Sequence, residues 1–534
     1  MDTKALRQKI LDLAIRGKLV PQDPNDEPAS VLLERIRAEK QQMVKEGKLK
    51  AKDIKNDTVI FKGDDNLHYE QFSDGTVKCI EDEIPFELPD GWAWCRVGSI
   101  TQFIRNGANI KQDKEAQGYP ITRIETISNG EINTEKFGYA NIFELEKFEK
   151  YLLHIDDILM SHINSPVHLG KSAIYDGNYE TPIIHGMNLL CIRLVEKSSS
   201  YYLLYAFRTS LFKDFVWENM KQAVNQASIT TASISSFLLP LAPFNEQRRI
   251  TKTIKQYTNL IDRIENDKTN LQQILSVTKS KILDLAIRGK LVPQDPNDEP
   301  ASVLLERIRA EKEELIKQGK IKRDKKESVI FKGDDNSYYL NKDGQCVDIG
   351  DDIPFDIPNS WEWTLLGNIV QLNPRNKISD DMEVSFVPMP LIDDGFSGNH
   401  VSEIRKWNDV KTGFTHFAEG DIGVAKITPC FENRKSTVFN NLCNGYGAGT
   451  TELHILRTYA DTISHKFLLF FVKTDYFIQA GKQTFSGAVG QQRIGKEYIS
   501  NSLFPLPPLA EQERIVNAVE TLFAQIDKIS EQIL

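Results

Sequence analysis

A long internal repeat constrains the fold of this chain more than any other feature of its sequence. Residues 9–40, KILDLAIRGKLVPQDPNDEPASVLLERIRAEK, recur without change as residues 281–312. A looser copy follows, because VIFKGDDN at 59–66 returns at 329–336. Self-similarity of this kind predicts a structural unit that is built twice.

Two inserts that barely resemble each other lie between the repeated segments, at about residues 100–239 and 369–503. Similarity resumes after each insert, in PLAPFNEQRRI at 240–250 and PLPPLAEQERI at 505–515. Simple duplication followed by drift would not leave identical flanks beside inserts that have lost their likeness. We therefore infer that each half is a common frame that holds an insert under separate pressure to differ.

Length and composition are those of a water-soluble protein with several domains. The chain has 534 residues, of which 40% are hydrophobic and 26% charged, and this length predicts three or four domains. No apolar run approaches the ~18 residues of a membrane span, and the polar N-terminus is not a signal peptide. The six cysteines form no CxxC pair, which argues against a zinc site or a disulfide framework and predicts a reducing cytoplasm.

A net charge of -9 is unusual for a protein that binds nucleic acid on its own, because such proteins are usually basic. It still allows a binder whose basic residues are confined to one face. It also allows a protein whose partner subunit supplies the phosphate contacts.

The segment from Glu246 to Gly289 is predicted to form one long helix. Its apolar positions follow one another in steps of four and three once Lys268 and Thr278 fill two gaps, which is the heptad seam of a coiled coil. Gly289 and Pro293 form a usual helix end. The predicted seam residues are Ile250, Ile254, Tyr257, Ile261, Ile264, Leu271, Leu275, Ile282 and Leu285.

The two ends of the chain copy this helix in two pieces. The C-terminal piece repeats the first part of the seam and the N-terminal piece repeats the last part. We therefore expect the ends to meet as a split helix that pairs antiparallel with the central one, in a closed ring with approximate two-fold symmetry. The alternative is two separate amphipathic helices, each docked on its own domain. The seam residues of the two pieces are Ile515, Val519, Leu522, Ile526, Ile529, Leu6, Ile10 and Leu13.

Each insert mixes short β-like runs with helices, so each is predicted to be an α+β domain. Strands are expected at residues 121–127, 158–161, 189–194, 422–427 and 453–456. Helices are expected at 201–220 and 464–482.

The sequence contains no motif for catalysis. It has no GxGxxG after a strand, no GxxxxGK[ST], no HExxH, no GxSxG and no DPPY-type motif of an adenine methyltransferase,. The paired carboxylates Asp64 and Asp65, which recur as Asp334 and Asp335, sit in a polar KGDDN segment that predicts a solvated turn rather than a metal site.

Both inserts carry loops of small, polar and basic residues beside their strands. Arg, Lys, Asn and Gln pair with base edges, whereas Ser and Thr hold phosphates, so clusters at matching places in two divergent inserts indicate DNA contact. The candidates are Ser161, His162, Asn164, Lys171, Asn188, Gln222, Asn225, Gln226 and Ser228 in the first insert, and Lys426, Thr428, Arg434, Lys435, Thr450, Thr451, Gln491, Gln492 and Arg493 in the second. The expected direct readers of bases are Asn164, Lys171, Asn225, Gln226, Lys426, Arg434, Gln491, Gln492 and Arg493.

This order of parts resembles the specificity (S) subunit of type I restriction-modification systems over the whole chain. The resemblance rests on P-L-x-P-x-x-E-Q-x-R-I before each heptad helix and on AIRGKLVPQ, which marks one subgroup. It implies an α+β fold in which two target recognition domains are separated by two long antiparallel coiled-coil regions, in a pseudo-two-fold circular arrangement.

The resemblance also implies a division of the chain into five parts. These are an N-terminal conserved helical region (1–55), a first target recognition domain (56–244), a central coiled-coil region (245–325), a second recognition domain (326–509) and a C-terminal helix (510–534). The stretch from Gln41 to Glu83 and its copy are longer than in the shortest members of the family, and the sequence assigns them no role.

In such a protein each recognition domain reads one half of a split, asymmetric DNA sequence, and the helices set the gap between the halves. The chain is not an enzyme by itself and holds no metal or cofactor. Two methyltransferase subunits that methylate adenine at N6 with S-adenosylmethionine dock on the conserved helices. Two ATP-driven motor-nuclease subunits complete the complex, so that S-adenosylmethionine, ATP and Mg²⁺ are bound by the partners.

Two other classes of protein remain open on the residues alone. The first is a coiled-coil scaffold that assembles partner proteins without reading DNA, which the negative charge favours. The second is a nuclease or methyltransferase in its own right, against which the missing motifs argue.

Overall fold

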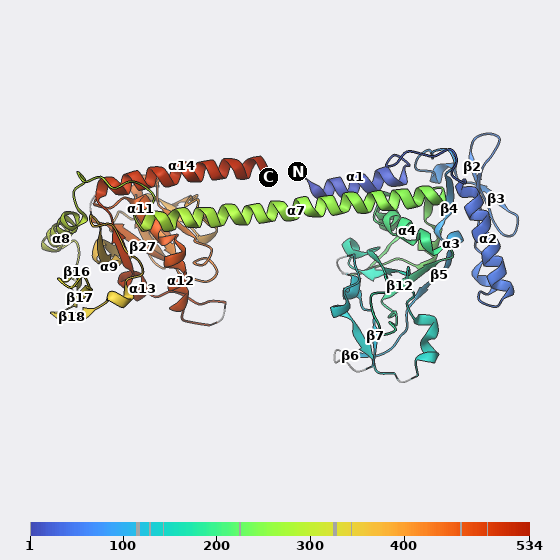
Figure 1. The fold of residues 1–534 in the computed structure, drawn as a ribbon, viewed down its shortest axis with the longest axis horizontal. Coiled ribbons are helices and arrows are strands. Elements are labelled where there is room, and N and C mark those ends of the chain that lie inside the picture. The colour runs from blue at the N-terminus through green and yellow to red at the C-terminus, as the bar shows by residue number, and fades with distance from the viewer. Residues whose placement is uncertain are drawn as a thin grey trace. The chain divides into compact units, whose positions relative to one another are not determined.

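The structure is a computed structural model that describes residues 2–113, 118–127, 130–142, 144–223, 226–323, 328–342, 344–459, 462–488 and 490–533. It divides into two compact units, Met1–Asp267 and Lys268–Leu534, here called unit 1 and unit 2. Each unit combines helices with strands (Figure 1). None of the described helices has the length and apolar content needed to cross a membrane.

One long helix, α7 (Phe244–Ile287), contributes its first part to unit 1 and its second part to unit 2. It confirms the predicted helix that ends just before Gly289. That glycine has a φ of +65°, a left-handed conformation that favours glycine after a helix. The amide of Lys290 donates to the carbonyl of Leu285 at 2.9 Å and closes the helix end.

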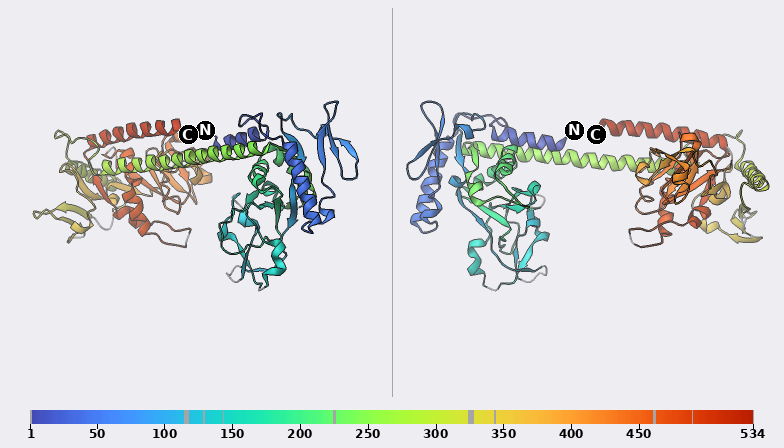
Figure 2. Two further views of the ribbon diagram at one scale, coloured as in Figure 1. Left: turned by 45° about the vertical axis from the view of Figure 1, so that its right-hand side comes forward. Right: turned by 180° about the vertical axis from the view of Figure 1, so that it is seen from behind.

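Each terminal helix packs along α7 within its own unit. In unit 1, α1 (Thr3–Ile15) runs antiparallel to α7 (Figures 1 and 2), and Arg7 bonds Asp262 at 2.6 Å and Glu265 at 2.8 Å. In unit 2, α14 (Leu509–Ile533) does the same, and the Lys279 ammonium lies 2.5 Å from the Asp527 carboxylate.

Burial along the predicted seam is uneven. Tyr257 and Ile264 expose 45% and 44% of their surface, because α1 covers only one side of α7 there. The buried seam residues are Ile10, Ile250, Ile254, Ile261, Ile282, Ile515, Val519 and Ile526, whereas Leu6, Leu13, Leu271, Leu275, Leu285 and Leu522 are half-buried and Ile529 is exposed.

The E-Q-x-R motif at the start of α7 anchors that helix to the repeated segment before it. The Trp92 indole donates to the Glu246 carboxylate at 3.0 Å inside the protein. Gln22 donates to the same carboxylate at 3.2 Å, and Arg249 forms an ion pair with Asp26 at 2.5 Å. Because burial removes water from it, the Glu246 carboxyl has a raised pKa,.

Unit 2 repeats this anchor at the start of α14. Trp361 donates to Glu511 at 2.9 Å, Gln294 donates to Glu511 at 2.6 Å, and Arg514 pairs with Asp298 at 2.6 Å. The motif therefore has a structural role that is the same in both units, which explains why it recurs while the inserts diverge.

Despite their different sequences, the two inserts form four-stranded antiparallel sheets with the same strand order. The orders are β11-β9-β12-β5 in unit 1 and β25-β24-β27-β20 in unit 2. The strands are β5 (Thr101–Asn106), β9 (Ile158–Ser161), β11 (Ser172–Ile174), β12 (Leu189–Leu194), β20 (Val370–Leu372), β24 (Ile422–Ala425), β25 (Ser436–Val438) and β27 (Leu453–Thr458). The strands expected at 158–161 and 189–194 are confirmed in full.

Each sheet also holds the same buried ion pair. Arg193 binds Asp157 through two hydrogen bonds of 2.7 and 2.6 Å. Arg457 binds Asp421 in unit 2 through bonds of the same two lengths. The aspartates are almost fully buried, so the pair belongs to the common frame of the two inserts.

Each insert leaves and returns to the frame through two adjacent strands. In unit 1, β4 (Ala93–Arg96) pairs antiparallel with β15 (Leu238–Leu241). In unit 2, β19 (Glu362–Leu365) pairs antiparallel with β28 (Leu503–Leu506). Within each unit, the two ends of an insert are therefore hydrogen-bonded to one another.

Both helices predicted in the inserts are broken by a threonine. The segment 201–220 forms α4 (Ser200–Ala206) and α5 (Ser210–Asn219), and 464–482 forms α11 (His465–Val472) and α12 (Asp475–Gln483). Thr209 and Thr474 accept the amides of Phe212 and Phe477 at 3.4 and 3.2 Å. Each threonine thus caps the second helix of its pair, which breaks a continuous apolar pattern.

The strand expected at 121–127 is wrong. β7 (Tyr119–Ile121) ends at Ile121, and Ile124–Ile127 forms a short 3₁₀ helix. The Thr126 hydroxyl accepts the amide of Arg123 at 2.9 Å, so a local side-chain bond replaces the strand ladder.

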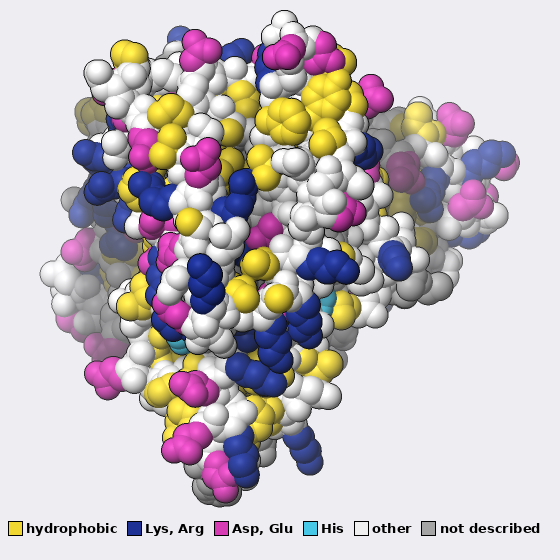
Figure 3. Space-filling model, turned by 90° about the vertical axis from the view of Figure 1, so that its right-hand side faces the viewer, with side chains coloured by type: hydrophobic (Ala, Val, Ile, Leu, Met, Phe, Trp, Pro, Cys, Tyr) yellow, Lys and Arg dark blue, Asp and Glu magenta, His cyan; other side chains and the backbone are white. Residues whose placement is uncertain are grey.

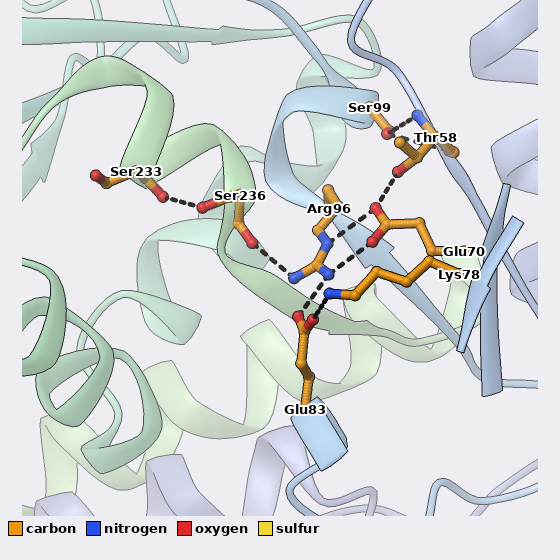
Figure 4. A network of polar contacts seen from close by, with 8 residues as sticks. All are labelled: Thr58, Glu70, Lys78, Glu83, Arg96, Ser99, Ser233 and Ser236. Carbon is orange, nitrogen blue, oxygen red and sulfur yellow. Dashed lines mark hydrogen bonds and ion pairs between the residues drawn. The ribbon is translucent and has the colours of Figure 1, made fainter. Parts of the chain in front are cut away.

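The stretch without an expected role contains the end of α2 (Ala29–Lys45) and a three-stranded sheet, β1 (Val59–Lys62), β2 (His68–Gln71) and β3 (Val77–Cys79). Figure 4 shows how Arg96 of β4 holds this sheet. The guanidinium bonds Glu70 at 3.1 and 2.7 Å and Glu83 at 2.7 Å. These contacts attach the segment to the strand from which the insert begins.

The remaining helices and strands complete the two units. They are α3 (Val97–Ile100), α6 (Thr231–Ser236), α8 (Ala301–Lys317), α9 (Leu366–Ile369), α10 (Trp407–Val410), α13 (Lys496–Asn501), β6 (Gln112–Asp113), β8 (Gly138–Ala140), β16 (Ser328–Lys332), β17 (Tyr338–Lys342), β18 (Gln345–Asp348), β21 (Glu383–Val387), β22 (Glu403–Lys406), β23 (Thr415–Ala418) and β26 (Tyr446–Gly449).

Candidate nucleic-acid interface

The polar loops of the first insert converge at one end of its four-stranded sheet. β9 leads directly into β10 (Ile163–Asn164), which pairs with β14 (Gln226–Ser228), and β14 pairs with β13 (Lys221–Ala223). Ser161 lies opposite Leu189 in the sheet and donates its amide to the Lys171 carbonyl at 2.8 Å. Loops far apart in sequence are thereby brought into one junction.

The second insert builds the same junction from its own loops. The amide of Lys426 donates to the Glu452 carbonyl, and the amide of Ile494 donates to the Lys426 carbonyl, both at 3.0 Å. The amide of Thr428 donates to the Gln492 carbonyl at 2.9 Å. We call these two regions the loop junctions: residues 161–171, 188–189, 221–223 and 226–229 of unit 1, and residues 425–428, 450–453, 486–488 and 490–494 of unit 2.

The two loop junctions share a backbone arrangement and differ in side chains. In unit 1 the Ile229 amide donates to the His162 carbonyl at 3.0 Å. This bond corresponds to the one from the Ile494 amide to the Lys426 carbonyl in unit 2. Ile229 and Ile494 therefore occupy equivalent positions, and so do the residues directly before them, Ser228 in unit 1 and Arg493 in unit 2. One scaffold with different polar groups is suited to bind two different polar surfaces.

Burial divides the candidates of unit 1 into two groups. Ser161 and His162 are 1% and 6% exposed, which argues against direct base contact, and burial lowers the pKa of the imidazole. Asn164 donates to the Ser161 hydroxyl at 3.2 Å. Asn188, Gln222 and Gln226 are exposed, Asn164, Lys171 and Ser228 are half-buried, and Asn225 lies outside the described residues.

Two basic candidates of unit 2 are engaged by the protein itself. Arg434 forms an ion pair with Asp475 and donates to the Lys473 carbonyl at 2.9 Å. Lys435 donates to the Ile392 carbonyl at 2.7 Å. These bonds hold the loop before β25, and the side chains of Arg434 and Lys435 are only 19% and 15% exposed, which argues against base contact.

The other candidates of unit 2 lie in its loop junction. Thr450 accepts the amide of Glu452 at 3.2 Å, and Thr428 accepts the amide of Gln492 at 3.2 Å. Thr451 and Gln491 are exposed, whereas Lys426, Thr428, Thr450, Gln492 and Arg493 are half-buried.

Sequence reasoning missed Glu452. Its carboxylate accepts two hydrogen bonds from Arg493, at 2.9 and 3.0 Å, and these bonds lower the pKa of the Glu452 carboxyl. Glu452 follows the predicted Thr450 and Thr451, but its partner Arg493 is 41 residues away. No local sequence pattern therefore predicts this ion pair.

Positive charge is gathered locally although the chain carries a net charge of -9. Figure 3 shows the face on the side of α2 and β3, where Lys and Arg side chains gather in the middle and acidic side chains lie around them. Among the described residues, no group of three or more His, Cys, Asp or Glu side chains is placed to hold a metal ion.

Comparisons with known proteins match this architecture. The family model described as the type I restriction modification DNA specificity domain matches residues 89–273 and 358–534. The EcoAI specificity subunit of Escherichia coli is 49% identical over 254 residues, which are 47% of this chain and 40% of that protein. The EcoEI specificity subunit of Escherichia coli is 43% identical over 280 residues, 52% of this chain and 44% of that protein.

The aligned part of this chain thus spans less than half the length of these two relatives. A solved chain from a study of complex assembly and conformational transition in a type I R-M system shares the fold. Its TM-score is 0.51 at 15% identity, over 84% of this chain and 94% of that chain. Because the family model covers more than half of the sequence, in two separate segments, the chain belongs to the type I restriction-modification DNA specificity family.

Proposed function

We propose that this chain is the DNA-recognition subunit of a type I restriction-modification complex, in which each recognition domain reads one half of a bipartite, asymmetric target. The observation that carries the proposal is the pair of loop junctions, which share a backbone arrangement and differ in side chains. Two different half-sites require different side chains on a common support.

The helices in this proposal set the gap between the half-sites and dock two methyltransferase subunits. The 32-residue repeat supports this role, because two copies of one partner require the same surface twice. The proposed boundaries are 1–55, 56–244, 245–325, 326–509 and 510–534. In the complete arrangement, α1 and α14 form a split coiled coil against α7 with pseudo-two-fold symmetry.

The chemistry of the complex belongs to the partners in this proposal. Two methyltransferase subunits use S-adenosylmethionine to methylate adenine at N6, and two restriction subunits use ATP and Mg²⁺. This chain contributes selection of the site and no catalytic group. The methyltransferases supply much of the non-specific attraction to phosphate, which reconciles DNA binding with a net charge of -9,.

A methylation map tests the proposal. The chain is co-expressed with its neighbouring methyltransferase, and modified adenines are read by long-read sequencing of the host DNA. We expect one bipartite motif that disappears when this chain is omitted. A stable complex with an active methyltransferase that yields no motif would support the scaffold alternative instead.

The role of the helix as a spacer has a separate test. Deleting residues 264–270 removes one heptad and shortens α7 by about 10 Å, or about three base pairs at 3.4 Å each. We expect the gap in the methylated motif to change, or binding to be lost, while neither half-site changes. The exposed Asn270→Ala variant is the control, and an unaltered gap in the deletion variant refutes the spacer.

A further inference from the structure

A half-buried ion pair in the loop junction of unit 2, formed by Arg493 and Glu452, offers side-chain donors to a base edge. We propose that Arg493, held by Glu452, binds the major-groove edge of a guanine in the half-site of the second recognition domain. The inference rests on the proposed function and adds the identity of one base and a positioning residue, Glu452.

The guanidinium donors of Arg493 are only partly used within the protein. Nε and Nη2 each donate one hydrogen bond to Glu452, at 2.9 and 3.0 Å, and Nη1 donates to the Gln491 carbonyl at 2.8 Å. An arginine has five N–H donors. One N–H on Nη1 and one on Nη2 therefore remain without a partner among the described residues. In the proposed contact these two N–H groups donate side by side to the base.

Guanine presents two acceptors, O6 and N7, side by side in the major groove, and a parallel pair of arginine N–H groups matches them. The Arg493 side chain is 40% exposed, so part of it is open to a ligand. The loop that follows α12 projects from unit 2 on the side opposite α14 in every view (Figures 1 and 2).

The support of this guanidinium is rigid at both partners. The backbone of Arg493 exchanges two hydrogen bonds with Ser486, at 2.9 and 3.1 Å. The Glu452 amide bonds Thr450 at 3.2 Å, and its carbonyl accepts from Lys426 at 3.0 Å. Fixing the side chain before binding reduces the entropy lost on contact with a base.

Charge favours a base over a phosphate as the ligand. A lone arginine is drawn to the DNA backbone by its charge, which carries no sequence information. Here the Glu452 carboxylate cancels that charge and leaves two directional donors. The pair is thus better suited to read a base edge than to hold the backbone.

The pair is specific to the second recognition domain. The Arg457–Asp421 pair has an exact counterpart in unit 1, in Arg193 and Asp157. Arg493 and Glu452 instead correspond in position to Ser228 and Asn188, which form no such ion pair. A feature found in one junction only is what discrimination between two half-sites requires.

The test measures base preference in the complex with the methyltransferase. The methylation map of wild type is compared with those of Arg493→Ala, Arg493→Lys and Glu452→Gln. We expect Arg493→Ala to lose a guanine preference of roughly 5- to 150-fold at one position of one half-site. Arg493→Lys keeps the charge but lacks the parallel donors, so it should lose most of the same preference.

Glu452→Gln should weaken the preference at that same position and leave affinity for unrelated DNA unreduced, since a negative charge is removed. A positioning role predicts this base-specific loss, whereas a general loss of folding would lower binding to every sequence. Arg405→Ala is the control, because Arg405 forms an exposed pair with Glu403 at 2.8 Å in the same unit but outside the loop junction. It should keep the full motif.

Synthetic DNA with 7-deazaguanine at the assigned position removes the N7 acceptor. Wild type should bind it more weakly than guanine, and Arg493→Ala should not distinguish the two. An unchanged motif in Arg493→Ala, or an equal loss of affinity for all sequences with a smaller salt dependence, refutes the inference. A wild-type chain that yields no bipartite motif refutes the proposed function itself, which is a different result.

Discussion

Replacing Glu70 and Arg96 together by leucine should leave unit 1 nearly as stable as before, although both belong to a buried network (Figure 4). The reason is found in unit 2, where the corresponding positions carry Leu340 and Leu365. Both leucines pack against the hydrophobic core of that unit. The same frame therefore tolerates either an ion pair or two apolar side chains at this place.

The single replacement Glu70→Leu should be costly. The side chains of Arg96 and Glu70 are only 14% and 5% exposed, and removing one partner of a buried ion pair costs about 3–5 kcal/mol. Arg96 keeps its bond to Glu83, so we expect the lower value, about 3 kcal/mol. The double variant loses the bond from Thr58 to Glu70, worth about 1 kcal/mol, and the exposed bonds of Arg96 to Glu83 and to the Ser236 carbonyl, where water replaces the guanidinium. It should therefore be about 2 kcal/mol more stable than Glu70→Leu.

Hydrogen exchange followed by mass spectrometry measures the free energy of local opening at each segment. A local measurement is needed because a chain with two units does not unfold in one step. Amides of β1–β3 should exchange on the order of 100-fold faster in Glu70→Leu and only a few-fold faster in the double variant. Strands β16–β18 are the reference within the same molecule and should not change. Equal effects of the single and double replacements would refute the reasoning.

Three further predictions concern buried polar groups. Burial lowers the pKa of Lys473 from 10.5 to about 7. Between these two pH values the unfolded chain binds more protons than the folded one, so the melting temperature of unit 2 should rise from about pH 7 to about pH 10. Lys473→Met should flatten that rise. Asp157→Asn leaves the Arg193 guanidinium without its counter-charge and should lower the free energy of unfolding of unit 1 by about 3 kcal/mol in urea titrations; no shift in midpoint would contradict the structural role of the pair. Trp361→Phe removes the donor to Glu511 and should cost about 1–3 kcal/mol, seen as faster exchange at the start of α14 but not of α7.

Features set by repetition and periodicity were predictable from the sequence. The repeat predicted a structure built twice, and the heptad pattern predicted α7 to within two residues at its ends. Apolar β-like runs predicted β9 and β12. The interruptions at Thr209 and Thr474 were not predictable from apolar spacing, because a threonine that caps a helix looks the same in sequence as one that lies within it.

The candidate site was predictable only in part. The structure brings most of the predicted loop residues together in the two loop junctions; their contact with DNA stays a prediction. Which side chains are free was not predictable, since that depends on partners distant in sequence. Arg434 and Arg493 look equivalent in the sequence, yet the Arg434 side chain pairs with Asp475 and is 19% exposed, whereas the Arg493 side chain pairs with Glu452 and is 40% exposed.

The paired strands at the base of each insert have a thermodynamic consequence. Because β4 bonds β15, and β19 bonds β28, the frame holds the two ends of each insert together whatever lies between them. The entropy of closing such a loop grows only with the logarithm of its length, by about 0.6 kcal/mol for each doubling. The free energy of the frame therefore depends little on the size of the insert, and each insert depends on its own core for stability. One insert should thus be replaceable by another that enters and leaves through the same two strands.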